Sequence, residues 1–216
     1  MTRWGMVIDK KKCVGCWSCM VACKQEHFLP RNVLWNRVLI TECREYPAVS
    51  KVMYPVMCNH CKDAACIEVC PTGASYRRED GIVLIDHDRC TGCRACVVAC
   101  PYQQRTYYDE KNSEHFEGQG LTVYELKGRE LNPLQKGTVL KCTFCAERVD
   151  GGLEQGLKPG ADREATPACV IACPTEARIF GDLDDPQSGV SNLIRARSGI
   201  PLHEEFDTEP SVYYVD

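Results

Sequence analysis

The chain has 216 residues, which suits one large domain or two small ones, and its 17 cysteines make up about 8% of them, far above ordinary usage. The formal charge of −4, with both signs interspersed, argues against a nucleic-acid partner. No stretch approaches about 18 apolar residues, and the N-terminal segment is charged by Asp9. We therefore expect neither a transmembrane helix nor a signal peptide, and any export or membrane attachment would come through partner subunits.

The first part of the chain predicts strands that lead into cysteine-rich loops. Residues 4–9 (WGMVID) have the pattern of a strand, and residues 19–27 that of a short helix. Residues 52–57 (VMYPVM) predict another strand, in which Pro55 indicates an edge position because proline cannot donate to a neighbour.

A hairpin and a long insertion follow. Residues 74–86 predict two short strands around a turn at 79–81 that contains glycine. Residues 101–141 form an insertion relative to a minimal cysteine module. This insertion contains a polar run at 109–120 and a candidate strand at 121–126 (LTVYEL).

The C-terminal part predicts a loop, two strands and a helix. Residues 150–168 contain four glycines and two prolines, so we expect a loop that either contacts a partner or is a solvated connection. Residues 177–183 and 211–216 are candidate strands. Asp185 is expected to N-cap a helix over 186–197 that has proline in its first position.

Sixteen of the cysteines fall into four groups of four, and Cys43 is left over. The first and third groups have the spacing C-x2-C-x2-C-x3-C, the second C-x2-C-x4-C-x3-C and the fourth C-x2-C-x23-C-x3-C. In chain order the groups are Cys13, Cys16, Cys19 and Cys23; Cys58, Cys61, Cys66 and Cys70; Cys90, Cys93, Cys96 and Cys100; and Cys142, Cys145, Cys169 and Cys173.

The groups belong to an internal repeat. The segment MVIDKKKCVGC (6–16) matches VLIDHDRCTGC (83–93), and ACIEVCPTGA (65–74) matches ACVIACPTEA (168–177). The first group is therefore like the third, and the second is like the fourth.

Three chemistries use clustered cysteines, and the spacing favours one of them. Disulfides suit small secreted domains, but these cysteines are crowded along the chain. Zinc uses paired C-x2-C units and does not require a third cysteine two residues later. A 4Fe–4S cube offers three irons to one tight loop, and its fourth iron takes a ligand from elsewhere, usually a cysteine followed by proline. That proline follows Cys70, Cys100 and Cys173 but not Cys23, and we expect iron–sulfur clusters.

The order of the groups predicts which cysteines share a cluster. The second and third groups flank the predicted hairpin, the layout of a two-cluster ferredoxin in which the fourth cysteines are exchanged. The predicted sets are Cys58, Cys61, Cys66 with Cys100; Cys90, Cys93, Cys96 with Cys70; Cys13, Cys16, Cys19 with Cys173; and Cys142, Cys145, Cys169 with Cys23. The predicted fold is α+β, with a ferredoxin-like module at 51–100 nested inside another at 1–50 and 101–216 that carries loop insertions. The alternative topology pairs the first group with the second and the third with the fourth.

These motifs closely resemble the four-cluster iron–sulfur subunit of molybdopterin oxidoreductases of the dimethyl sulfoxide reductase family, over nearly the whole chain. The resemblance rests on MVIDKKKCVGCWSCMVACK, MCNHCKDAACIEVCPTGA, DRCTGCRACVVACPY, KCTFCAERV and ACVIACPTEARIFGDLDDPQS. The last segment looks most like members from arsenate, polysulfide, thiosulfate and phenylacetyl-CoA oxidoreductase complexes. The resemblance implies the same nested pairing. Some members hold a three-iron cluster where Trp replaces the residue at Cys93, so the cysteine here implies four 4Fe–4S clusters.

The resemblance also implies a function in anaerobic electron transport. Each cluster is predicted to be fully ligated by cysteine, and no other catalytic motif is visible, so we expect a non-catalytic subunit that passes single electrons. The implied partners are a molybdenum or tungsten catalytic subunit and often a membrane quinone-reactive subunit. The cluster of Cys90, Cys93, Cys96 and Cys70 is implied to lie farthest from the catalytic subunit. The complex could lie on either the cytoplasmic or the periplasmic side of the membrane. A freestanding polyferredoxin and a zinc-stabilised interaction module are the alternatives, and the insertion at 101–141 favours the subunit.

Several residues near the cysteines invite a role. Ligated clusters would add a charge of about −8, which neighbouring cations would offset, although a solvated surface charge is the alternative for each. The candidates are Lys62, Arg94, Lys141, Arg148 and Arg178. We expect His60 to pack or hydrogen-bond rather than ligate, Trp17 to shield the first group, and Cys43 to be a free thiol.

Overall fold

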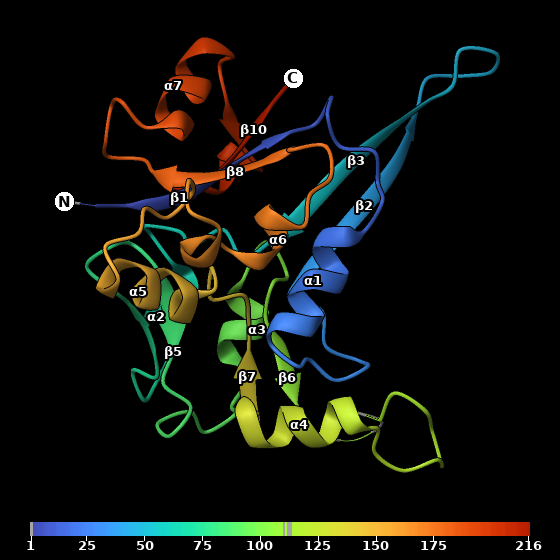
Figure 1. Cartoon of the computed structure of the whole chain (residues 1–216), viewed down its shortest axis with the longest axis vertical. Coiled ribbons are helices and arrows are strands. Elements are labelled where there is room, and N and C mark those ends of the chain that lie inside the picture. The colour runs from blue at the N-terminus through green and yellow to red at the C-terminus, as the bar shows by residue number, and fades with distance from the viewer. Residues whose placement is uncertain (1, 110, 112–113) are drawn as a thin grey trace.

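The computed structural model describes residues 2–109, 111 and 114–216, and a four-stranded sheet within it joins the two ends of the chain (Figure 1). Strand β1 (Trp4–Asp9) pairs antiparallel with β8 (Arg178–Asp182) and parallel with β10 (Val212–Val215), and β9 (Ile200–Pro201) lies outside β10. All of β1 is buried because its two faces pack against different apolar clusters. The predicted strands at 4–9, 177–183 and 211–216 are confirmed.

Three two-stranded antiparallel pairs accompany this sheet. They are β2 (Asn36–Cys43) with β3 (Ser50–Met57), β4 (Ser75–Arg77) with β5 (Val83–Ile85), and β6 (Thr106–Tyr108) with β7 (Thr138–Leu140). Figure 1 shows the β2–β3 pair projecting from the body as an arm. The predicted hairpin at 74–86 is confirmed, and Pro55 does lie in an edge strand, opposite Val38 of β2. The partner strand β2 was not predicted.

Short helices begin within or beside the cysteine motifs. They are α1 (Ser18–Glu26), α2 (Ala65–Glu68), α3 (Ala95–Ala99), α5 (Ala146–Glu154) and α6 (Ala168–Ile171). Helices α4 (Val123–Leu131) and α7 (Gly189–Ala196) and two 3₁₀ turns, Arg163–Ala165 and Glu204–Phe206, complete the set. Helix α1 packs against α6, and α2 packs against α3. No described helix has the length and apolar character needed to cross a bilayer.

The candidate strand at 121–126 is wrong, because these residues cap and begin helix α4. The Thr122 hydroxyl accepts a hydrogen bond from the Glu125 backbone N–H at 3.2 Å, and the Glu125 carboxylate accepts one from the Thr122 N–H at 2.7 Å. This reciprocal capping box satisfies two N–H groups at the helix start, which outweighs the strand preference of the apolar residues. Within the polar run at 109–120, residues 110, 112 and 113 lie outside the described residues.

Two other helix boundaries differ from the prediction. The expected loop at 150–168 begins as helix, because α5 continues to Glu154; a side chain at Gly152 would place its Cβ 2.3 Å from that of Ala165. Helix α7 starts after Ser188, whose hydroxyl accepts from the Ser191 N–H at 3.2 Å. Asp185 instead accepts from a backbone N–H two residues later, so it stabilises a turn and not the helix start.

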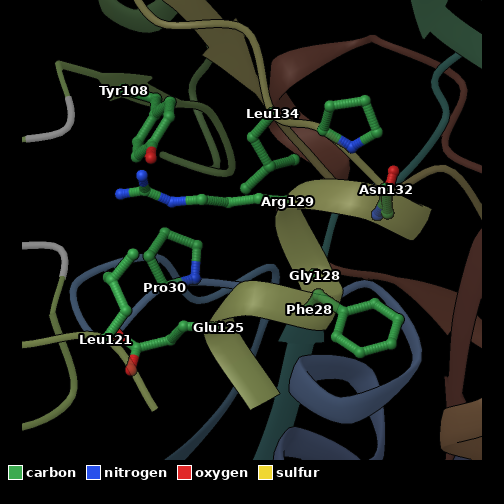
Figure 2. A pocket seen from close by; sticks show the side chains of 10 residues that line it. Phe28, Pro30, Tyr108, Leu121, Glu125, Gly128, Arg129, Asn132 and Leu134 are labelled. Carbon is green, nitrogen blue, oxygen red and sulfur yellow. The ribbon is translucent and has the colours of Figure 1, made fainter. Parts of the chain in front are cut away.

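Helix α4 packs on the segment that follows α1, beside a cavity of about 140 Å³ (Figure 2). Gly128 allows the close approach, since a Cβ there would lie 2.6 Å from that of Phe28. Figure 2 shows the Arg129 side chain extending across the cavity toward Tyr108. No cysteine lines this cavity, so it is separate from the cysteine sites.

Candidate metal centres

The four predicted ligand sets are named here by the order in which they lie in the molecule. Site A is Cys13, Cys16, Cys19 and Cys173; site B is Cys142, Cys145, Cys169 and Cys23; site C is Cys58, Cys61, Cys66 and Cys100; and site D is Cys90, Cys93, Cys96 and Cys70. All 17 cysteines are free thiols in the structure, so none is held in a disulfide.

The structure brings the distant fourth cysteine of the outer sites next to the other members. Burial raises the pKa of the Cys23 thiol, and the thiolates of the other three site B cysteines raise it further. Burial also raises the pKa of Cys13, and the thiolates of Cys19 and Cys173 act in the same direction. Cys23 and Cys173 therefore lie near cysteines with which they were predicted to share a cluster, although they are 119 and 154 or more residues from them in the sequence.

The inner sites are assembled in the same way. Burial raises the pKa of Cys61 to about 12, with the thiolates of Cys58, Cys66 and Cys100 adding to the effect. Cys70 lines one small cavity together with the other three site D cysteines. Burial acts to raise the pKa of Cys70, but hydrogen bonds from the Ser75 backbone N–H and the Thr72 hydroxyl outweigh it and lower the pKa to about 7. That these sets ligate clusters stays a prediction.

The sequence repeat is repeated in the backbone geometry. Strand β8 follows the fourth cysteine group and pairs antiparallel with β1, which precedes the first group. In the same way, β4 follows the second group and pairs antiparallel with β5, which precedes the third. Asp9 donates its N–H to the Ala177 carbonyl, and the equivalent Asp86 donates to Ala74, both at 2.8 Å. The Asp9 and Asp86 carboxylates each accept from the backbone N–H groups two and three residues later, at 3.0 and 3.2 Å in both copies. Two segments far apart in the chain thus form the same unit as one continuous segment.

Electrostatic interactions between cysteines of neighbouring predicted sites indicate a linear order. The Cys19 thiolate of site A raises the pKa of the buried Cys169 in site B, after the larger effect of burial. Burial and then the Cys58 thiolate of site C raise the pKa of Cys142 in site B to about 12. Arg105 lies near cysteines of both site C and site D. The sequence of sites is therefore A, B, C, D, with Cys16 exposed at one end, Cys93 exposed at the other, and every cysteine of site B buried.

The glycine in each C-x-G-C loop is needed for a left-handed turn, with φ of +68° at Gly15 and +65° at Gly92. Their surroundings differ. A Cβ at Gly92 would lie 2.0 Å from the Gly137 carbonyl oxygen, whereas one at Gly15 would meet the flexible Met53 side chain at 3.1 Å.

We predict that Gly92→Ala destabilises the protein by about 1–3 kcal/mol more than Gly15→Ala, because both share the strained φ but only Gly92 meets fixed backbone. Denaturant unfolding of both variants measures this difference, and the iron lost from site D gives a second readout. Equal destabilisation of the two variants would contradict the packing difference.

Buried polar atoms without partners test whether these sites fit iron–sulfur clusters. Among the described residues, two such atoms, Asn59 Nδ2 and His60 Nε2, belong to residues that lie between two site C cysteines in the sequence. Thr143 Oγ1 belongs to a residue between two site B cysteines, and Arg105 Nη2 is a fourth such atom. His60 Nδ1 accepts from the Val83 N–H at 3.0 Å, so in the neutral ring Nε2 carries the proton and is a donor. The sulfides and thiolates of a cluster are the acceptors that such donors require. The residues therefore fit the group.

The other residues singled out from the sequence divide into two classes. His60 is buried and stacks on Phe144 with 3.8 Å between ring centroids, which confirms packing and hydrogen bonding. Lys62, Arg94 and Arg148 contact Glu209, Tyr107 and Glu26 respectively, at or near the surface. Lys141 and Arg178 are instead buried, so the solvated alternative does not hold for them. Trp17 is 49% exposed at the rim of site A, and Cys43 is a free thiol at the end of β2.

Two residues that lie beside the predicted sites were missed by the sequence analysis. His27 Nε2 lies 3.3 Å from the Cys145 sulfur, and its ring packs against Trp35 in a tilted arrangement with 4.6 Å between the centroids. Arg105 is buried between sites C and D. Neither residue is adjacent to a cysteine of the site that it contacts, so no spacing pattern indicated either of them.

The cysteine sites and their ferredoxin-like surroundings define an iron–sulfur protein. Residues 49–118 match the family model of the 4Fe–4S dicluster domain. A Halobacterium salinarum chain named as a dimethyl sulfoxide reductase iron–sulfur subunit is 41% identical, over 100% of this chain and 80% of that one. A selenate reductase subunit of Mesobacillus selenatarsenatis is 40% identical over 99% of this chain and 72% of that one. The arsenate respiratory reductase iron–sulfur subunit of a Shewanella species is 38% identical over 99% of this chain and 96% of that one. The chain belongs to the family of iron–sulfur electron-transfer subunits of molybdopterin oxidoreductases, and it binds 4Fe–4S clusters.

Proposed function

We propose that the chain carries four 4Fe–4S clusters, one at each of sites A to D, and that single electrons pass along them in that order. The observation that carries this proposal is the linear order of the sites, with an exposed cysteine in each end site and four buried cysteines in site B between them. When bound, a 4Fe–4S cluster accepts and returns one electron at a time. The protein's own contribution is to fix the spacing of the sites and to exclude water from the central ones.

The nested arrangement is part of the proposal. Residues 51–100 would form the inner module with sites C and D, and residues 1–50 and 101–216 the outer module with sites A and B. Support comes from the repeated backbone unit, from the packing of α1 on α6 and of α2 on α3, and from the dicluster match at 49–118. A bidentate ion pair between Arg78 of the inner module and Asp150 of the outer one, at 2.6 and 2.7 Å, would link them.

The two end sites, A and D, suggest where partners bind. Exposed apolar side chains lie near Cys16 in the sequence, namely Val14, Trp17 and Val21, and Val98 is exposed close to Cys96 of site D in the sequence. We assign site A to a molybdenum or tungsten catalytic subunit and site D to a membrane quinone-reactive subunit, in keeping with the family resemblance. Association with the membrane would then depend on that second partner.

Anaerobic purification of the native protein tests this function. We expect about 16 iron and 16 acid-labile sulfide per chain, together with a copurifying subunit that contains molybdopterin. A chain that purifies alone with full iron would be a freestanding shuttle, and a chain without iron would overturn the proposal altogether.

A further inference from the structure

Each space between successive sites holds one buried basic side chain. Arg178 lies between sites A and B, Lys141 between B and C, and Arg105 between C and D, and their exposed fractions are only 3%, 3% and 5%. Among the described residues, no carboxylate forms an ion pair with any of the three. A buried cation without a carboxylate is costly, so its negative partner must be something else in the site.

Arg178 is held between the first two sites by its guanidinium. Its Nη2 donates to the Asn36 side-chain oxygen at 2.8 Å, and its Nη1 lies 3.7 Å from the Cys169 sulfur of site B. Burial acts to lower the pKa of Arg178, but the thiolates of Cys169 and Cys19 outweigh it and raise the pKa above its usual value. The charge is therefore shared between site A and site B.

Lys141 occupies the next space. Its ammonium group donates to the carbonyl oxygens of Val83 and Cys142. Burial lowers the pKa of Lys141, and the thiolate of Cys58 in site C and that of Cys142 in site B both oppose this effect. The two carbonyl acceptors fix the ammonium between these two sites.

Arg105 occupies the third space. Its Nη1 donates to the Ser75 hydroxyl at 2.7 Å, while its Nη2 is buried without a partner. Burial acts to lower the pKa of Arg105, but the thiolates of Cys66 and Cys58 in site C and of Cys96 in site D raise it above the usual value. The Nη2 donor is thus buried near thiolates of both sites.

We propose that Arg178, Lys141 and Arg105 each place one positive charge between two successive clusters and raise the reduction potentials of both. This inference rests on the proposed function, because it assumes a cluster at each site. Reduction adds a negative charge to a cluster, and a nearby buried cation stabilises that charge with little screening by solvent. Because each cation acts on two neighbours, it raises both of their potentials and changes the difference between them little.

Redox titration of the intact complex, followed by EPR, tests the role of Arg105. In Arg105→Gln we expect the oxidised-to-reduced ratio at a fixed potential to rise about tenfold at sites C and D, which is about 59 mV for a one-electron couple. Sites A and B are expected to be unchanged, and Arg105→Lys, which keeps the charge, is expected to titrate like the parent. Lys62→Gln is the matched control, because it removes an equal but exposed charge next to Cys61 of site C and is expected to leave the potentials unchanged.

The outcomes separate this inference from the proposed function. A parent protein with fewer than four clusters would refute the function, whereas four clusters with unshifted potentials in Arg105→Gln would refute the inference alone. If Arg105→Gln loses iron, Lys141→Gln makes the same comparison at sites B and C. Loss of iron in both variants would overturn the tuning role, because the cations would then be needed for cluster assembly.

Discussion

Replacing Cys23 by alanine is expected to remove the cluster of site B and to leave that of site A intact. Cys23 lies in the motif of Cys13, Cys16 and Cys19, so its neighbours in the sequence suggest the opposite result. The structure nevertheless buries the Cys23 thiol beside Cys142, Cys145 and Cys169. With one of four thiolates missing, the site B cluster loses a ligand, and we expect about a quarter of the iron to be lost.

Cluster-resolved EPR and iron analysis of Cys23→Ala check this expectation. Cys43→Ala is the control, because Cys43 is also a free thiol but lies at the end of β2 outside the four sites, and it is expected to keep all the iron. Loss of the site A signal in Cys23→Ala would show that consecutive cysteines share a cluster and would refute the nested pairing.

The features that could be predicted from sequence are those that depend on local chemistry. The residue pattern of 4–9 predicted the strand that leads into the first cysteine group, and that of 19–27 predicted the helix that begins within it. The repeat extends this reasoning to the second copy, since the hydrogen bonds of Asp9 recur at Asp86. The assignment to an iron–sulfur family therefore needed no structure.

The features that could not be predicted depend on tertiary packing. Composition alone assigned the glycine-rich residues 150–154 to a loop, but they continue helix α5. The helix tolerates Gly152 because this glycine packs closely against Ala165. Lys141 and Arg178 were candidates for offsetting the cluster charge, but so were three other cations, and only the fold shows that these two are enclosed. Arg105 is brought to sites C and D by strand β6, which follows it, and nothing in its immediate sequence marks it. The error at α4 was different, because the capping residues Thr122 and Glu125 were visible in the sequence and were overlooked.

Replacing Cys100 by alanine is expected to interrupt electron transfer along the protein, whereas Cys70→Ala is expected to shorten the path at one end. The two cysteines occupy equivalent positions in their motifs, since each precedes a proline. Cys100 lies with Cys58, Cys61 and Cys66 in the interior site C, and Cys70 lies in the cavity of terminal site D. Loss of the interior cluster roughly doubles the distance that an electron must cross, and tunnelling rates fall exponentially with distance.

Rapid-mixing EPR of the complex, with electrons supplied from the side of site A, distinguishes the two variants. In Cys100→Ala we expect sites A and B to be reduced and site D to stay oxidised for the whole time in which the parent protein is reduced completely. In Cys70→Ala we expect sites A, B and C to be reduced at the parental rate, so this variant controls for the loss of one cluster as such. If Cys70→Ala instead removed the cluster of Cys58, Cys61 and Cys66, the inner module would not exchange its fourth cysteines, and the order of sites proposed for electron transfer would fail with it.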